Sequence, residues 1–258
     1  MAENSDMSVR FAGSRRLFGT EGFRRLQQAH VTVIGVGGVG SWAVETLARS
    51  GVGYLTLIDG DVVVESNINR QLQALGNTLG RPKVSVLAER IAEINPLCHV
   101  NAIQLFLTPE NMDGLIGKNR SDFVIDAIDS VRDKAGLIAY CRNHAIQLIT
   151  VGSAGGQLDP TQIDICDLSR TQQEPLLAKV RKRLRSQYGF PRNPKNKFDI
   201  DAVYSLEPVR YPDRENSGEV EDGKIAGLNP AGFGTTMAVT ASFGMAAASY
   251  VLKRIAAV

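Results

Sequence analysis

The segment at residues 35–40, Gly-Val-Gly-Gly-Val-Gly, constrains the fold of this chain more than any other feature. It follows an apolar run at 31–34 that is typical of a strand, and it leads into a helix-like segment at 39–50. A glycine-rich turn between a strand and a helix exposes backbone N–H groups at the helix N-terminus, where they bind phosphate. We therefore predict a nucleotide site whose turn contains Gly35, Gly37, Gly38 and Gly40.

An acidic residue, Asp59, ends the next predicted strand, at 54–58. Such a residue holds a ribose hydroxyl in dinucleotide-binding folds, so Asp59 by itself fits a dehydrogenase equally well. Arg70 and Lys83 follow, and hydride transfer has no evident use for two cations there. An enzyme that neutralises a triphosphate and its departing pyrophosphate does need them. The sequence thus favours ATP, while an NAD-dependent oxidoreductase and a noncatalytic nucleotide-binding module stay open as alternatives.

Strand-like and helix-like segments alternate through the first 150 residues. We predict strands at 31–34, 54–58, 99–105, 123–126 and 147–151, and helices at 39–50, 82–94, 109–116 and 132–145. This alternation predicts an α/β, Rossmann-like fold with a doubly wound, mainly parallel sheet. Ligands of such sheets bind beyond the carboxyl ends of the strands, where Asp59, Asp126 and Asp129 fall.

The second half of the chain has a different character. We expect an edge strand at 161–167, a helix at 175–188 and a polar loop at 212–223. The segment 231–252 carries no charge, but its small and hydroxyl-bearing residues favour a buried or subunit-interface helix over a membrane span.

A basic insertion lies within this half. Residues 178–197 contain eight cations and no acidic residue: Lys179, Arg181, Lys182, Arg183, Arg185, Arg192, Lys195 and Lys197. Charge runs are most often solvated faces, but this one also fits a salt-sensitive contact with a phosphate backbone. Tyr188 and Phe190 lie between the cations and would offer stacking surfaces for RNA bases.

Length and composition set outer limits. A chain of 258 residues fits one domain, with a nucleotide-binding core at about 28–165 and a substrate and interface region at about 166–258. The net charge of +2 does not by itself indicate a polyanionic partner. Cys98, Cys141 and Cys166 form no C-x-x-C pair, which argues against a disulfide framework and a four-cysteine zinc site. With a polar N-terminal segment unlike a signal peptide, we expect a cytoplasmic protein.

The order of the motifs resembles the ubiquitin-activating-enzyme-like adenylating family over about residues 10–165. The matching residues after the glycine turn are Asp59, Asp61, Asn67, Arg70, Gln71, Lys83, Asp126, Asp129 and Ser130. This resemblance implies that Asp59 holds the ribose of ATP, Arg70 and Lys83 the phosphates, and Asp129 a magnesium ion. Asn67 and Gln71 would orient the triphosphate, and Asp61 and Ser130 would complete the ATP-binding set.

The resemblance also implies a homodimer, because the family uses an N-terminal arginine that reaches the phosphates of the neighbouring subunit. Arg16 matches this arginine best, with Arg15 and Arg10 as competitors. A bound monovalent cation and a cysteine-desulfurase or sulfur-acceptor partner are left open by the resemblance.

Two features that the chain lacks limit the branch of the family to which it can belong. The chain lacks the paired C-x-x-C motifs of sulfur-carrier activators and the nucleophilic cysteine of ubiquitin-type activators. The motifs at 126–132, 141–142, 152–163 and 203–207, together with the basic insertion, resemble the tRNA threonylcarbamoyladenosine dehydratase branch. That branch implies that ATP adenylates the threonyl carboxylate of N6-threonylcarbamoyladenosine, next to the tRNA anticodon. The carbamoyl group of the same nucleoside then attacks, AMP leaves and a ring forms.

One departure concerns a cysteine that some members carry before a Gly-Phe-Gly segment. Here Asn229, Pro230 and Ala231 precede Gly-Phe-Gly at 232–234, so no role of that cysteine transfers. An adenylating enzyme that acts on a protein C-terminus stays open as a rival. The two differ in whether ATP–pyrophosphate exchange depends on RNA or on a protein partner.

Overall fold

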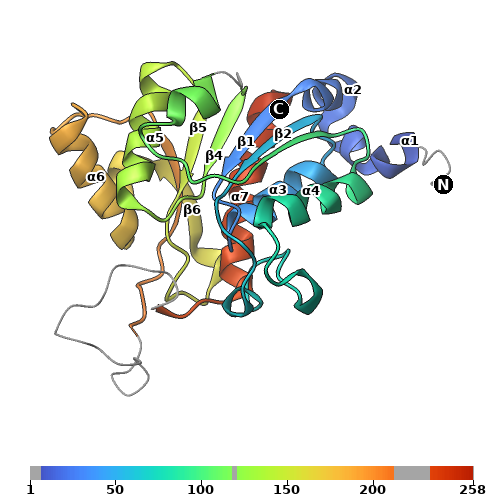
Figure 1. Cartoon of the computed structure of the whole chain (residues 1–258). Coiled ribbons are helices and arrows are strands. Elements are labelled where there is room, and N and C mark those ends of the chain that lie inside the picture. The colour runs from blue at the N-terminus through green and yellow to red at the C-terminus, as the bar shows by residue number, and fades with distance from the viewer. Residues whose placement is uncertain (1–6, 118–120, 212–232, 258) are drawn as a thin grey trace.

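A seven-stranded sheet in the order β3-β2-β1-β4-β5-β7-β6 forms the centre of the computed structural model, which describes residues 7–117, 121–211 and 233–257 (Figure 1). The strands are β1 His30–Ile34, β2 Tyr54–Ile58, β3 His99–Ile103, β4 Phe123–Asp126, β5 Leu148–Val151, β6 Ile163–Asp167 and β7 Asp201–Ser205. All neighbours pair in parallel except β6 and β7. The predicted doubly wound, mainly parallel sheet is confirmed, and β6 is the predicted edge strand.

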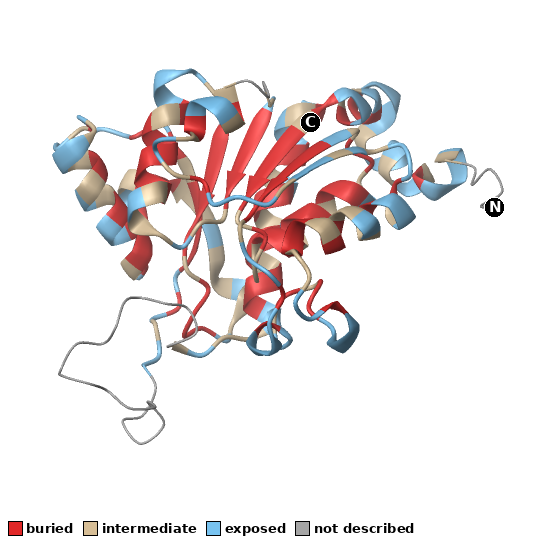
Figure 2. Ribbon diagram, viewed as in Figure 1, coloured by how far each residue is buried: buried red, intermediate tan, exposed pale blue. Residues whose placement is uncertain are grey.

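Helices cover both faces of this sheet (Figure 1). They are α1 Met7–Arg10, α2 Ala12–Gln28, α3 Gly40–Arg49, α4 Lys83–Ile94, α5 Val131–Asn143, α6 Pro175–Gln187 and α7 Met237–Ala256. One apolar cluster joins the sheet to α3, α4 and α7, and a second joins it to α5 and α6. Because both faces are covered, the central strands are buried on each side (Figure 2).

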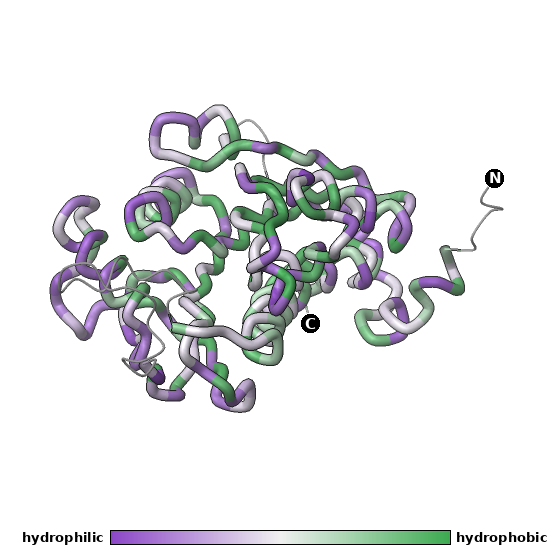
Figure 3. The backbone as a smooth tube through the Cα atoms, turned by 60° about the horizontal axis from the view of Figure 1, so that its bottom comes forward, coloured by the Kyte–Doolittle hydropathy of each residue, from purple (hydrophilic) through white to green (hydrophobic). Residues whose placement is uncertain are grey.

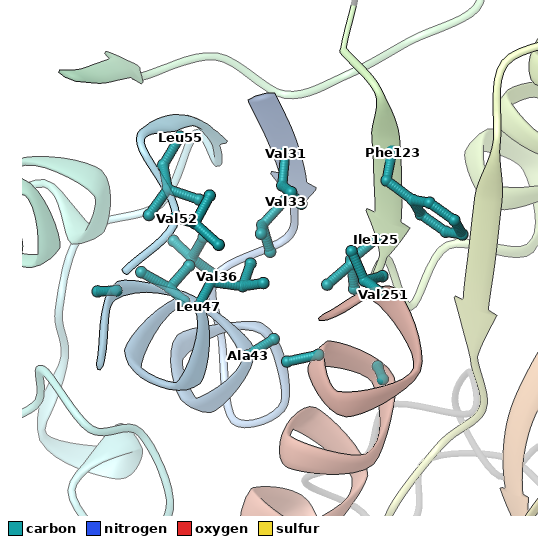
Figure 4. Packing of buried hydrophobic residues seen from close by; sticks show 14 of the residues in the cluster. Val31, Val33, Val36, Ala43, Leu47, Val52, Leu55, Phe123, Ile125 and Val251 are labelled. Carbon is teal, nitrogen blue, oxygen red and sulfur yellow. The ribbon is translucent and has the colours of Figure 1, made fainter. Parts of the chain in front are cut away.

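The core under α3 and α7 sets the position of the glycine turn. Val31 and Val33 of β1 lie in one cluster with Leu47 of α3 and Val251 of α7 (Figure 4). Helix α7 is predominantly apolar along its length (Figure 3) and buries one side against this core. The expected uncharged helix therefore exists, but it begins at Met237 and continues to Ala256. Among the described helices, none has the length and apolar content needed to cross a bilayer.

Other differences from the predicted elements have local causes. The helix expected at 109–116 is reduced to a five-residue π-helical turn, Asp113–Gly117, which contains two glycines. Strand β3 ends two residues earlier than expected. Helix α2 was not predicted because only Gly22, Phe23 and Leu26 are buried, too few for an amphipathic stripe. Helix α1 and strand β7 were not predicted either, and the other boundaries shift by two residues or fewer. The expected loop at 212–223 and the segment 229–231 lie outside the described residues.

Candidate active site

The glycine turn and the carboxyl ends of β2 and β4 border one cleft of about 510 Å³. The strand order changes direction between β1 and β4, which is where ligands of doubly wound sheets bind. The residues predicted for nucleotide binding that line it are Gly35, Gly37, Gly38, Asp59, Asp61, Asn67, Arg70, Gln71, Lys83, Asp129 and Ser130. Gly40 does not line the cleft, and neither does Asp126, which was expected at this edge of the sheet but is fully buried.

Gly35 and Gly40 shape the turn by steric necessity. Gly35 has φ +79°, and a Cβ there would lie 2.8 Å from the carbonyl oxygen of Ala127. A Cβ on Gly40 would lie 1.8 Å from the carbonyl oxygen of Gly35. Gly40 therefore allows the close approach of helix α3 to the turn, while Gly35, Gly37 and Gly38 line the cleft.

Asp59 connects the glycine turn to the end of β2. Its Oδ2 accepts the Val36 N–H at 2.8 Å, and its Oδ1 accepts the Asp61 N–H at 2.9 Å. The residue is buried, and this burial raises the pKa of Asp59, although the two N–H groups and the charge of Lys83 oppose the shift. Each carboxylate oxygen keeps acceptor capacity toward the cleft, as a ribose contact requires.

Lys83 and Arg70 supply the positive charge of the cleft. Lys83 is the first residue of α4, and its buried Nζ lies 2.7 Å from Asp61 Oδ2. Arg70 lies across the glycine turn, because a Cβ on Gly38 would be 3.2 Å from Arg70 Cδ. Its guanidinium donates to the Ser66 carbonyl at 2.8 Å and to Asn69 Oδ1 at 2.9 Å. Burial lowers the pKa of Arg70, but an arginine stays charged.

Asn67 and Gln71 are buried amides beside these cations. Asn67 Oδ1 accepts the Val64 N–H at 3.2 Å, and Gln71 Oε1 accepts Gln73 Nε2 at 3.3 Å. Gln73 Nε2 also donates to the Val36 carbonyl at 2.7 Å, which links the Gln71 amide to the turn. With their oxygens so used, the NH₂ groups are the donors available to an anion.

Asp129 and Ser130 follow β4 on a loop that the buried side chain of Asp126 holds in place. Asp126 Oδ1 accepts the Ile128 N–H at 3.1 Å, and its Oδ2 accepts Thr150 Oγ1 at 2.7 Å. Lys134 Nζ lies 2.9 Å from Asp126 Oδ2, and both side chains are fully buried. Removing one member of a buried pair leaves an unpaired charge, so this network fixes the loop firmly. Asp129 itself is exposed at the cleft.

A second loop, 152–154, forms the wall opposite α4 and was not assigned from the sequence. Glu174 lies beneath it, and its Oε1 accepts the Ser153 N–H at 2.8 Å while its Oε2 caps α6 at the Leu177 N–H. Burial raises the pKa of Glu174. Phe106, Thr108 and Thr235 also line the cleft without having been predicted. In the sequence, only the glycines at 152–156 indicated a turn at this wall of the cleft. Nothing in the local pattern distinguished Phe106 from a core residue.

The comparisons with known proteins agree with this geometry. A model of the ThiF family matches residues 12–258. The chain belongs to the ThiF family. The tRNA threonylcarbamoyladenosine dehydratase of Haemophilus influenzae is 50% identical over 256 residues, or 99% of this chain and 96% of the relative. The crystal structure of E. coli tRNA N6-threonylcarbamoyladenosine dehydratase with ATP superimposes with a TM-score of 0.88 at 45% identity, covering 100% of this chain and 98% of that one. The structure of the same enzyme with AMP also gives 0.88, at 46% identity and equal coverage.

Three arginines of this ThiF-family chain, Arg10, Arg15 and Arg16, are candidates for reaching the phosphates of a neighbouring subunit, and the structure shows where each of them lies. Arg10 donates to the carbonyls of Glu93 and Ile94, at the end of α4 opposite Lys83. A helix of 12 residues is about 18 Å long, so Arg10 is fixed far from its own cleft. Arg15 and Arg16 are exposed on α2 and do not line that cleft either. None of the three therefore completes the site of its own chain.

The basic insertion divides into structural and exposed cations. Arg181 donates to Thr171 Oγ1, and Arg185 donates to the Pro191 carbonyl at 3.2 Å and lies 5.1 Å from the centre of the Phe198 ring. Both are half-buried, as is Arg183. Exposed cations of the insertion are Lys179, Lys182, Arg192, Lys195 and Lys197. Arg181, Lys182, Arg185 and Arg192 line a shallow hollow of about 330 Å³, the basic groove.

Base stacking on Phe190 was wrongly expected. Phe190 is 3% exposed and packs against Phe198, with ring centres 5.0 Å apart. The guanidinium of Arg142 lies 4.3 Å from the centre of its ring and covers it further. Tyr188 is half-buried. These rings belong to the core under α5 and α6.

The cysteines show no sign of nucleophilic activation. Burial raises the pKa of Cys98 and of Cys141 to about 12. It also raises the pKa of Cys166, near which Asp164, Asp167 and Asp201 add to the shift. A thiol in such surroundings stays protonated at neutral pH and is a poor nucleophile.

Proposed function

We propose that this chain is an ATP-dependent tRNA threonylcarbamoyladenosine dehydratase. It adenylates the threonyl carboxylate of N6-threonylcarbamoyladenosine near the anticodon, and intramolecular attack by the carbamoyl group then releases AMP. The observation that carries the proposal is the cleft itself, in which a glycine-rich turn, the buried carboxylate of Asp59 and two cations, Arg70 and Lys83, line one cavity. The full-length similarity to dehydratases supports the choice of substrate.

The residues of the cleft fit the adenylation step. When the threonyl carboxylate attacks the α-phosphate, negative charge grows on that phosphate and on the departing pyrophosphate. Lys83 and Arg70 are held in place by Asp61, Ser66 and Asn69, so they stabilise this charge without reorganising. We assign ribose binding to Asp59 and phosphate orientation to the NH₂ groups of Asn67 and Gln71.

The donor set of the cleft fits a magnesium ion that arrives with ATP. Among the described residues no group of three or more metal-binding side chains is prearranged, and magnesium is commonly held by one or two carboxylates together with substrate phosphates. Asp129 would hold the ion, which would neutralise phosphate charge when bound. A monovalent cation and a cysteine-desulfurase or sulfur-acceptor partner stay predictions of the sequence resemblance.

The cyclisation step needs positioning more than a protein nucleophile. The carbamoyl group and the acyl-adenylate belong to the same nucleoside, so their effective concentration is high once both lie in the cleft. The raised cysteine pKa values agree with a route that uses no protein thioester. Reaction on tRNA also favours a cytoplasmic enzyme.

The decisive assay incubates this protein with ATP and tRNA that contains threonylcarbamoyladenosine, then digests the tRNA for mass spectrometry. We expect a nucleoside lighter by one water, with AMP and pyrophosphate formed in equal amounts. An unchanged nucleoside would contradict the proposal. Exchange of pyrophosphate that required a protein C-terminus instead of RNA would favour the rival adenylating enzyme.

A pH dependence follows from the burial of Asp59. Its raised pKa means that it gains a proton at a higher pH than an exposed aspartate, and the protonated form accepts hydrogen bonds poorly. As the pH is lowered, ATP affinity should therefore begin to fall at a higher pH than it would with an exposed aspartate at this position. Asp59→Asn should bind ATP weakly throughout, with a flatter profile. Calorimetric titration measures the ATP affinity of both proteins at each pH. Because the protonation of ATP affects both proteins alike, it cancels in the difference between the two pH profiles. Parallel profiles would contradict the ribose role of Asp59.

We propose that the exposed cations of the basic insertion contact the tRNA backbone. Helix α6 begins at the cleft, where Leu176 forms part of the wall, and carries the basic groove further along its length. Contacts between these cations and the tRNA backbone would hold the anticodon loop while one nucleotide enters the cleft. Arg181 and Arg185 would serve mainly to shape this surface, because their side chains already have partners.

Reversing Lys182, Arg192 and Lys195 to Glu should weaken tRNA binding and reduce its salt dependence by about one unit of slope for each lost phosphate contact. These side chains are exposed, so thermal stability should hardly change. Lys253→Glu, at the exposed end of α7, is the control for a charge reversal elsewhere. Titrations at three salt concentrations test the surface, and an unchanged slope in the triple variant would place the RNA contact elsewhere.

We also propose that residues 1–258 form one adenylating domain, with a nucleotide-binding core at about 28–165 and a substrate and interface region at about 166–258, and that the chain acts as a homodimer. Arg16 is exposed and absent from its own cleft, as a residue that serves the neighbouring subunit would be. Ile68 and Met237 are 43% and 48% exposed, and their segments are joined by a hydrogen bond of 3.2 Å from Asn69 to the Thr235 carbonyl. These two exposed apolar side chains lie close in sequence to the cleft residues Asn67 and Thr235 and fit a subunit contact.

A further inference from the structure

Tyr211, which is exposed, and Phe233, which is half-buried, form an aromatic pair that does not line the cleft. Their ring centres are 5.4 Å apart at an interplanar angle of 64°, an edge-to-face arrangement. Tyr211 is 63% exposed although it is fixed by this contact. Among the described residues, the contact with Phe233 leaves most of Tyr211 open to solvent.

Backbone hydrogen bonds fix this pair next to the cleft. The Arg210 N–H donates to the Gly156 carbonyl at 2.8 Å, and the Gly156 N–H donates to the Gly234 carbonyl at 2.9 Å. Both aromatic segments are thus tied to the turn that follows the 152–154 wall. Thr235, two residues beyond Phe233, itself lines the cleft.

A hollow of about 350 Å³ lies between Tyr211 and the start of α6. Its wall includes Gln173, Pro175, Ala178, Arg181, Pro208 and Tyr211. Arg181 also borders the basic groove, and Glu174, which supports the cleft wall at Ser153, borders the hollow as well. The hollow therefore lies between the nucleotide cleft and the basic groove.

We propose that this hollow binds an RNA base adjacent to the nucleotide that enters the cleft, with its face stacked on Tyr211. The inference rests on the proposed tRNA substrate. Single-stranded RNA loops are recognised by bases that stack on aromatic rings and bond through their edges to polar side chains. Tyr211 supplies the ring, the Gln173 amide supplies edge contacts, and the cations of the basic groove match the phosphates on the far side. An RNA strand that crosses the basic groove toward the cleft passes this ring.

The test uses an anticodon stem-loop that contains threonylcarbamoyladenosine. Tyr211→Ala should bind it about five- to a hundredfold more weakly, the range expected for loss of one base–aromatic stack. Tyr211→Phe should bind like the unchanged protein, because the ring is retained. ATP affinity should stay the same in both. Tyr54→Ala removes an exposed ring on β2, at its amino end away from the cleft, and serves as the matched control.

Abasic stem-loops identify the base. Removing the flanking base on one side of the modified nucleotide should weaken binding to the unchanged protein and add no further loss in Tyr211→Ala. Full affinity in Tyr211→Ala, or losses that add for both flanking bases, would overturn the stacking site while leaving the proposed function intact. If the unchanged protein binds no stem-loop at any salt concentration, the stacking site fails, and the nucleoside assay on whole tRNA decides the proposed function separately.

Discussion

Replacing Lys83 by alanine is expected to lower the rate of ATP–pyrophosphate exchange by about a hundredfold or more. The Nζ of Lys83 is buried at the cleft and held 2.7 Å from Asp61, so the charge is fixed before the reaction begins. Arg70→Ala and Asp129→Ala should have effects of similar size, because in the proposed site each removes a group that would offset or organise phosphate charge. Single-turnover measurements would separate slower adenylation from weaker ATP binding.

Arg81→Ala is the matched control for these variants. Arg81 has a side chain that is 42% exposed, pairs with Glu89 and lies two residues before Lys83 without lining the cleft. It should retain near-normal exchange. Thermal unfolding distinguishes loss of chemistry from loss of fold, which matters most for Lys83 because its side chain is 6% exposed. Near-normal rates in all three cleft variants would contradict the assignment of the site.

Most residues that line this cleft could be predicted from the sequence, because the sheet topology brings the residues after its parallel strands to one edge. In a doubly wound sheet the residues that follow parallel strands meet at one edge. Asp59 follows β2 and Asp129 follows β4, so their convergence on the glycine turn required only the correct strand assignment. Lys83 begins α4, which returns from the same edge.

Residues whose role depends on long-range packing escaped prediction. Phe106 lines the cleft because its ring packs against Gly60, which belongs to a separate segment. The packing is so close that a Cβ on Gly60 would lie 2.6 Å from the ring. Glu174 supports Ser153 from 21 positions away along the chain. The error over Phe190 has the same origin, since a ring between basic residues has no local signal for burial against Phe198. Charge and periodicity identify surfaces, but which ring turns inward is decided by the tertiary core.

The position of Arg16 makes the proposed dimer testable through catalysis. If each cleft uses its own Asp129 and the partner's Arg16, then Arg16→Ala and Asp129→Ala homodimers both lose activity for different reasons. In a mixed dimer, the subunit with Arg16→Ala keeps Asp129 and receives an intact Arg16 from its partner. The other cleft lacks both groups. Random pairing of equal amounts makes half of all dimers mixed, with one complete site each, so about a quarter of wild-type activity should return.

Two differently tagged chains, expressed together and purified through both tags, allow the mixed dimer to be assayed directly. Tandem purification leaves only mixed dimers, whose turnover per dimer should approach half that of the wild type. Arg10→Ala is the control within the same region, because its bonds to the carbonyls of Glu93 and Ile94 give it a role in its own chain. Paired with Asp129→Ala, it should give the same turnover as wild type paired with Asp129→Ala. If purified mixed dimers of Arg16→Ala and Asp129→Ala are inactive, Arg16 does not act across the interface, and the exposed Arg15 becomes the next residue to test.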